Sequence, residues 1–305
     1  MQRYLLIRVL QAMITLLAIS VVIFVLARAT GDPVLLMLPP DASAQDAARL
    51  RQALGLDKPL VEQYWIFLSG VAHGDLGESL RSKKPVTELI GQRLPNTVKL
   101  GGFSMAIAVL LASILGVVAA VKRGTPIDVS VKIVAVLGQS LPVFWLGIVL
   151  IDVFAVRIRL LPASGTGDLT HYVLPGLCLG WFVVAGMMRL LRSSMLDTLD
   201  TEFVKLARVK GVPERWVILK HALRNALIPV VTFAGMYLAQ LITGTIIVET
   251  VFAWPGLGRL AYESVLNRDF PVIQGVVLVV AAIIVFINLM VDVLYAYIDP
   301  RIRYG

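Results

Sequence analysis

Few residues in this sequence have the types and spacing that bond-making chemistry requires. No Gly-Lys dipeptide occurs, so the phosphate loop that holds ATP through such a lysine is absent. The three histidines, His73, His171 and His221, are far apart and form no His-Glu-x-x-His pattern, and neither Ser79 nor Ser140 lies in a Gly-x-Ser-x-Gly elbow. We therefore expect a protein that is not an enzyme and has no catalytic, cofactor-binding or metal-binding residues. What remains is recognition by charged and hydrogen-bonding side chains.

A basic segment over residues 189–224 is the most distinctive recognition candidate, because it holds eight lysines and arginines. Thr201 or the aspartate before it can cap a short helix, and Gly211 followed by Pro213 ends that helix. Apolar residues within 203–207 fall on one helical face. By pattern alone, the segment is a solvated hairpin, a helix lying on anionic lipid, or a helix that docks on a partner protein.

A second candidate is a group of small, amide and hydroxyl side chains inside apolar stretches. Pro142 lacks a backbone N–H and frees a carbonyl near residue 138, and such a break in lipid must face protein or a water-filled path. Ordinary packing and hydrogen bonds between helices are the alternative. The group that could line a path for a solute comprises Gln139, Ser140, Pro142, Gln240, Thr243 and Thr245.

The elements that hold these residues are predicted to span a membrane. Of the 305 residues, 58% are hydrophobic and 16% charged, and the mean hydropathy is +0.82, whereas soluble proteins are about a quarter charged. The single cysteine, Cys178, excludes a disulfide scaffold. The net charge of +8 indicates basic cytoplasmic loops rather than nucleic-acid binding, because no basic run is interleaved with aromatic residues.

Six uncharged stretches are close to the roughly 20 residues that cross the hydrocarbon core of a bilayer as a helix. The first could be a signal peptide, since Arg3 and Arg8 precede it and Ala27-Arg28-Ala29 resembles a cleavage site, but its length favours an uncleaved span. We predict an all-α integral membrane protein with a single transmembrane domain over residues 1–305. Its six spans cover residues 9–27, 100–121, 133–151, 172–188, 226–248 and 272–291.

An even number of spans places both termini on one side, and the basic segment between spans four and five indicates that this side is the cytoplasm. Residues 28–99 then form an extracytoplasmic insertion, and residues 200–224 form a cytoplasmic loop. In the insertion, Asp41 can cap a helix over residues 42–54, and Gly55 can end it. We expect a small helical cap there, although a solvated loop fits the pattern as well.

The basic loop resembles the cytoplasmic loop of binding-protein-dependent ABC importers and fits their peptide and nickel branch best. That branch typically shows Arg-Thr-Ala-Arg-Ala-Lys-Gly and then His-Ala-Leu-Arg-Asn-Ala, with which Ala207, Arg208, Lys210, Gly211 and residues 221–226 agree. Two intervening positions differ conservatively in size. Further similar blocks run from end to end of the chain, over residues 50–60, 74–77, 140–144, 248–258 and 292–304.

The resemblance implies a permease subunit with the type I ABC importer fold in the bacterial inner membrane, importing di- or oligopeptides or peptide-like solutes such as glutathione. It also implies a homologous second permease, two cytoplasmic subunits that bind ATP and Mg²⁺, and an extracytoplasmic solute-binding protein. Coupling to the ATPases is then expected at Glu202, Phe203, Lys205, Leu206, Ala207, Arg208, Lys210, Gly211 and Arg215. An outer gate or a contact with the binding protein is expected at Glu249, Trp254, Pro255 and Gly256, with solvation or loop closure as the alternative.

Three other functions stay open at this point. A nickel or metal-chelate permease fits the same branch, because the binding protein could select the solute. A channel or secondary transporter would work without ATPases but should carry ionisable residues within its spans, where few occur. A membrane enzyme would need converging catalytic groups, which the sequence lacks.

Overall fold

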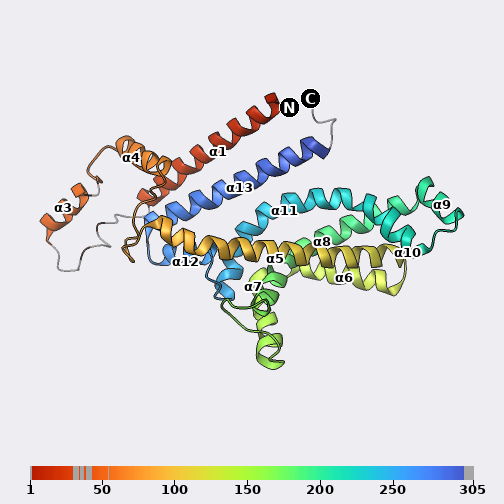
Figure 1. The fold of residues 1–305 in the computed structure, drawn as a ribbon. Coiled ribbons are helices and arrows are strands. Elements are labelled where there is room, and N and C mark those ends of the chain that lie inside the picture. Colours follow the sequence, from red (N-terminus) through yellow and green to blue (C-terminus); the bar gives the residue numbers. More distant parts are fainter. Residues whose placement is uncertain (1, 30–33, 35–37, 39–42, 54, 299–305) are drawn as a thin grey trace. The chain divides into compact units, whose positions relative to one another are not determined.

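The computed structural model describes residues 2–29, 34, 38, 43–53 and 55–298. Within these ranges the chain consists of helices and turns, with one isolated bridge between Glu78 and Pro85 (Figure 1), which confirms the all-α prediction. The contacts divide the chain into two units. Among the described residues, one comprises those up to 97 together with 255–289, and the other comprises residues 98–254 with 290–298.

Five helices among the described residues are long and apolar enough to cross a membrane. They overlap the predicted spans but are longer, because each helix continues past the uncharged stretch. These helices are α1 (Gln2–Ala29), α5 (Val86–Val121), α8 (Thr170–Leu199), α11 (Leu223–Val251) and α13 (Phe270–Ile298).

The third predicted span, residues 133–151, is not one straight helix. It is divided between α6 (Pro126–Ser140) and α7 (Val143–Leu150), which meet at an angle of 111°, and the pair could count as a sixth span. Pro142 explains the break, since it cannot donate to the preceding turn, and its carbonyl accepts the Leu146 N–H at 3.0 Å as the new helix starts. A π-helical turn, η1 (Ile151–Arg157), continues α7.

In the first unit, α1 packs on α4 (Leu60–Ala72) through aromatic side chains. The Phe24 ring lies 5.3 Å from the Tyr64 ring and 5.7 Å from that of Phe67, measured between centroids. The hydroxyls of Ser20 and Tyr64 are 2.8 Å apart and share a hydrogen bond. The insertion after α1 therefore folds back on α1 as a helical element.

The helix expected at residues 42–54 is α3 (Ala44–Ala53). Its cap is Ser43: the Ser43 hydroxyl donates to the Asp46 carboxylate at 2.6 Å and accepts the Asp46 N–H at 3.2 Å. The predicted capping residue, Asp41, lies outside the described residues. The predicted stop is confirmed, because Gly55 has a φ of +65°.

A second core of the first unit joins α12 (Leu257–Leu266) to the first turns of α5 and α13. Its buried members are Val86, Ile90, Leu257, Leu260, Val272 and Val276. The turn before α5 is fixed by Asp269, whose carboxylate accepts the Ser79 hydroxyl at 2.5 Å and the Leu80 N–H at 3.0 Å. This part of the unit is thus held by an apolar cluster and a buried carboxylate.

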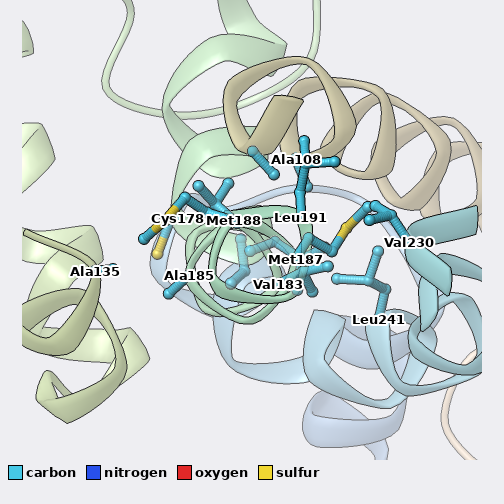
Figure 2. Close-up of a cluster of buried hydrophobic side chains, with 14 of the residues drawn as sticks. Ala108, Ala135, Cys178, Val183, Ala185, Met187, Met188, Leu191, Val230 and Leu241 are labelled. Atoms are coloured by element: carbon cyan, nitrogen blue, oxygen red, sulfur yellow. The ribbon is translucent and has the colours of Figure 1, made fainter. Parts of the chain in front are cut away.

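In the second unit, α8 is the central helix (Figure 2). Side chains from α5, α6 and α11, such as Ala108, Ala135 and Val230, surround its buried residues. Close approach depends on glycine: a Cβ on Gly180 would lie 2.8 Å from the backbone carbonyl oxygen of Ser104 on α5. Cys178 also belongs to this core.

Candidate functional site

The basic loop contains a short helix, α9 (Glu202–Val209), that stops where the sequence predicted. Gly211 has a φ of +75°, and its N–H donates to the Arg208 carbonyl at 2.9 Å, while the Val212 N–H donates to that of Ala207 at 3.2 Å. These two bonds form a Schellman motif, which glycine favours at this position. The chain then re-enters a helix at α10 (Glu214–Trp216), followed by the π-helical turn η2 (Val217–Ala222) and α11.

One face of α9 packs against its own chain. Val204 and Ala207 form a small buried cluster with Val217 of η2, against which Leu199 and Val212 pack. This cluster fixes α9 on the ends of α8 and α11. Ala207, which the resemblance places among the coupling residues with Phe203 and Leu206, is buried in this cluster and does not share their exposed face.

The opposite face of α9 exposes large apolar side chains. Phe203 is 46% exposed, Leu206 53% and Val209 83%. Exposed apolar groups clustered on such a short helix mark a surface that interacts with a protein or with a membrane. We call Phe203, Leu206 and Val209 the outer face of α9.

Charged residues surround this face, but some are already paired within the loop. Arg208 donates two hydrogen bonds to the Glu214 carboxylate, at 2.7 and 3.2 Å, and this bonding raises the pKa of the Arg208 guanidinium above its ordinary value. Lys205 pairs with Glu202 at 3.1 Å. Lys210 and Arg215 are exposed. Arg208 therefore braces the loop, whereas Lys210 and Arg215 lie on its exposed surface.

A buried ion pair, which the sequence did not reveal, supports the end of α8 from which the loop emerges. Arg192 donates to both carboxylate oxygens of Asp128, at 2.8 and 2.9 Å, and Lys132 lies 3.2 Å from the same carboxylate. The Asp128 side chain is 2% exposed. A pairing between residues 64 apart leaves no local pattern, and the one signal was an acid at the start of a largely apolar helix.

Part of the proposed path group lines a cavity of about 210 Å³ in the second unit. The wall includes Gln240, and it is otherwise apolar or aromatic: Val143, Leu179, Phe182, Val183, Tyr237, Leu241 and Gly244. The rings of Phe182 and Tyr237 are 6.1 Å apart, and Tyr237 stacks on Phe233 at 4.3 Å. Sequence reasoning missed these aromatics because aromatic residues in a membrane helix do not stand out.

The other members of the path group differ in exposure. Thr243 and Ser140 are exposed, with hydroxyls that donate to the backbone carbonyls of Gln240 and Val136. Gln139 is half-buried, and Pro142 is exposed at the helix break. Thr245 is 1% exposed and bonds the Ile242 carbonyl, so it faces the interior of its own unit and does not share a surface with Thr243.

The predicted outer-gate group is largely buried. Glu249 and Trp254 are fully buried, and Gly256 is buried as well. Trp254 packs edge-on against Tyr172 at 4.7 Å. These side chains build the turn after α11, and of the four residues only Pro255 is half-exposed. Solvation of Glu249, one of the alternatives considered, is therefore excluded.

The comparisons with known proteins decide the family. Residues 112–304 match the profile described as "Binding-protein-dependent transport system inner membrane component", and residues 1–101 match that of the N-terminal part of such components. The chain belongs to this family. The permease is thus a membrane component of a transport system that depends on a binding protein.

The relatives of the permease include proteins of the same length. It is 46% identical over 305 residues, all of both chains, to the glutathione transport system permease protein GsiC of Escherichia coli O6:H1, and 45% identical to that of strain K12. GsiC of Salmonella choleraesuis is 46% identical over the same length.

The fold is shared with solved importers. An inward-facing form of the MetNI methionine ABC transporter matches with a TM-score of 0.57 and 19% identity, over 69% of this chain and 96% of the other. An amino acid ABC transporter crystallised with histidines matches with a TM-score of 0.52 and 18% identity, over 77% of this chain and 98% of the other. At such low sequence identities, the similarity shows a shared fold and nothing about the solute.

Proposed function

We propose that the chain is the permease subunit of an ATP-driven importer for glutathione or a closely similar peptide-like solute. The observation that carries the proposal is the identity of 46% to GsiC over the whole of both chains, which includes the α9 loop and the helices around the cavity. The metal-chelate alternative has no comparable support, and a channel or secondary transporter does not fit the family.

In this proposal the chain binds no ATP, which is held with Mg²⁺ by two partner ATPases. A homologous permease forms a heterodimer with it, and an extracytoplasmic binding protein delivers the solute. In the proposed orientation both termini lie in the cytoplasm of a bacterium, as does the 200–224 loop, and residues 28–99 lie outside.

The function is tested by reconstituting the complete complex into vesicles and measuring ATP-dependent uptake of labelled glutathione. Competition by a dipeptide, by oxidised glutathione and by a nickel chelate defines the solute. Uptake of glutathione that needs ATP and the binding protein is the expected result. Uptake of the nickel chelate instead of glutathione would contradict the proposed solute but not the importer.

The outer face of α9 is proposed as the surface that docks on an ATPase subunit. Its three apolar side chains would enter a cleft, while Lys210 and Arg215 meet acidic residues at the rim. We expect Leu206→Ser to release the ATPase from the purified complex while the thermal unfolding midpoint of the permease is unchanged. The matched control is Val204→Ser, which should lower that midpoint because Val204 is buried. Full ATPase retention by Leu206→Ser would rule out this docking face.

The solute path is proposed to pass between this chain and the second permease, along Gln139, Gln240 and Thr243. Replacing these three residues by leucine should block uptake and leave basal ATP hydrolysis intact. Thr245→Val is the matched control, because Thr245 is buried and lies off this surface. Normal uptake by the triple variant would place the path elsewhere.

A further inference from the structure

A cavity of about 150 Å³ in the first unit combines two polar side chains with an apolar wall. The polar residues are Arg28, in the last turn of α1, and Gln274, near the start of α13. The wall consists of Ala27, Leu56, Leu80, Phe270 and Pro271. Because α1 and α13 are both candidate membrane spans and the cavity lies at their ends, it sits at the depth where lipid headgroups meet hydrocarbon.

Gln274 has a hydrogen-bond donor that the protein does not use. The residue is 6% exposed, and its Nε2 atom is buried without a hydrogen-bond partner. Among the buried side-chain nitrogen and oxygen atoms of the described residues, Gln274 Nε2 is the one without a hydrogen-bond partner. A buried donor is strongly disfavoured unless an acceptor reaches it, so the amide indicates that an acceptor group enters the cavity.

Arg28 supplies a positive charge that neutral groups hold in place. Its guanidinium lies 3.8 Å from the centroid of the Phe24 ring, and its Nε donates to the Gln63 side-chain oxygen at 3.3 Å. Gln63 is held in turn by bonds from its amide nitrogen to the Leu56 and Lys58 carbonyls, at 3.2 and 2.8 Å. No carboxylate pairs with Arg28 within the described ranges. The planar, multidentate guanidinium suits a phosphate or carboxylate.

We propose that this cavity binds the phosphodiester headgroup of an anionic phospholipid such as phosphatidylglycerol. The phosphate oxygens accept hydrogen bonds from Arg28 and Gln274, and the apolar wall receives the glycerol and the first methylenes. The acyl chains follow the neighbouring surface of α1, where Val22, Val25 and Leu26 are exposed. Basic pockets between membrane helices bind such headgroups in other proteins. The inference needs only a membrane-embedded chain and is independent of the transported solute.

The test uses the full-length permease, in complex with its partners, in nanodiscs of phosphatidylcholine with a minor fraction of phosphatidylglycerol. After release from the discs, native mass spectrometry gives the ratio of the two lipids retained. We expect phosphatidylglycerol to be enriched in the wild type. Arg28→Gln and Gln274→Met should each lower the enrichment by about tenfold, as the loss of a charge-assisted hydrogen bond predicts. Arg28→Lys should keep part of it.

The matched control is Arg81→Gln, which removes an exposed positive charge from the same unit but outside this cavity and should keep the enrichment. Gln274→Met also tests whether the unpaired Gln274 amide destabilises the protein when the lipid is absent. Without phosphatidylglycerol, this variant should unfold at a higher temperature than the wild type. The difference in unfolding temperature should shrink when the lipid is added. Wild-type enrichment in both Arg28→Gln and Gln274→Met would overturn the proposal. Complete displacement of the lipid by inorganic phosphate would overturn the lipid as ligand and assign a soluble anion.

Discussion

Gly211 decides the direction in which the chain leaves α9. Its φ of +75° closes the two hydrogen bonds of the Schellman motif, and nothing lies within 4 Å of a Cβ built on it. The requirement for glycine is therefore conformational and not steric. The backbone conformation of Gly211 therefore fixes the orientation of α10 relative to the outer face of α9.

A comparison of Gly211→Val with Gly211→Asn separates these effects. The left-handed region costs an ordinary residue roughly 1–2 kcal/mol, is worse for a β-branched one, and is tolerated by asparagine. We expect Gly211→Val to abolish solute-stimulated ATP hydrolysis by the complex and Gly211→Asn to retain most of it. Equal loss in both variants would mean that added bulk, rather than backbone conformation, is the cause.

The Asp128–Arg192 pair is the other residue-scale feature with a clear consequence. Removing one partner of a buried ion pair leaves a charge without compensation. Arg192→Met should therefore lower the thermal unfolding midpoint by several degrees, and adding Asp128→Asn should restore part of the loss. Differential scanning fluorimetry in detergent measures both. Glu62→Gln, which breaks the exposed Lys58–Glu62 pair, is the control and should have little effect. Strict additivity of the Asp128 and Arg192 changes would contradict the coupling.

At the scale of elements, glycines in α8 allow the neighbouring helices to pack closely against it. Gly180 lies so close to Ser104 that a methyl group would separate α5 from α8. In contrast, a Cβ on Gly102, also in α5, meets nothing within 4 Å. Glycine in a helix is useful only where such a contact exists, since alanine has the higher helix propensity.

Gly180→Ala should accordingly destabilise the permease by about 1–3 kcal/mol, the usual effect of overpacking. Gly102→Ala should be neutral or slightly stabilising. Chemical unfolding of the two variants in the same detergent gives the comparison. A neutral Gly180→Ala would show that α5 and α8 have freedom to move apart.

The elements also show what a sequence can predict. Gly211, Pro213 and Gly55 act through local backbone geometry, so the stops of α9 and α3 could be predicted. Pro142 predicted a break but not a bend of 111°, because the angle depends on tertiary packing, including Trp181 against Gly138. The inward turn of Ala207 and the Asp128–Arg192 pair depend on contacts between distant segments, which no local pattern records.

At the scale of the whole molecule, the family and the spans describe a multi-pass membrane protein, and its orientation is a prediction from charge. The basic segment at residues 189–224 is expected to remain in the cytoplasm, with residues 28–99 on the other side. The described helices allow a simple test, since the chain has one cysteine, Cys178, and it is buried.

In a Cys178→Ala background, single cysteines placed at Asp46 and Lys210 should react with an impermeant maleimide from opposite sides of the membrane. Both positions are exposed. Labelling in intact cells and in inside-out vesicles, with permeabilised samples as the control, measures the sidedness. Reaction of both positions from one side would contradict the orientation and the cytoplasmic docking of α9.

The contrast between α1 and α8 has a consequence for how the protein is made. Of the most apolar stretch of α1 only 11% is buried, whereas 61% of the corresponding stretch of α8 is buried. Because most of α1 is left uncovered by the rest of the chain, this helix is suited to enter the bilayer as soon as the ribosome delivers it. α8 carries Arg192 and relies on α11, which is synthesised later. Biosynthesis therefore passes through a stage in which the central helix lacks its main partner, and slow translation between residues 200 and 250 would prolong its exposure to membrane proteases.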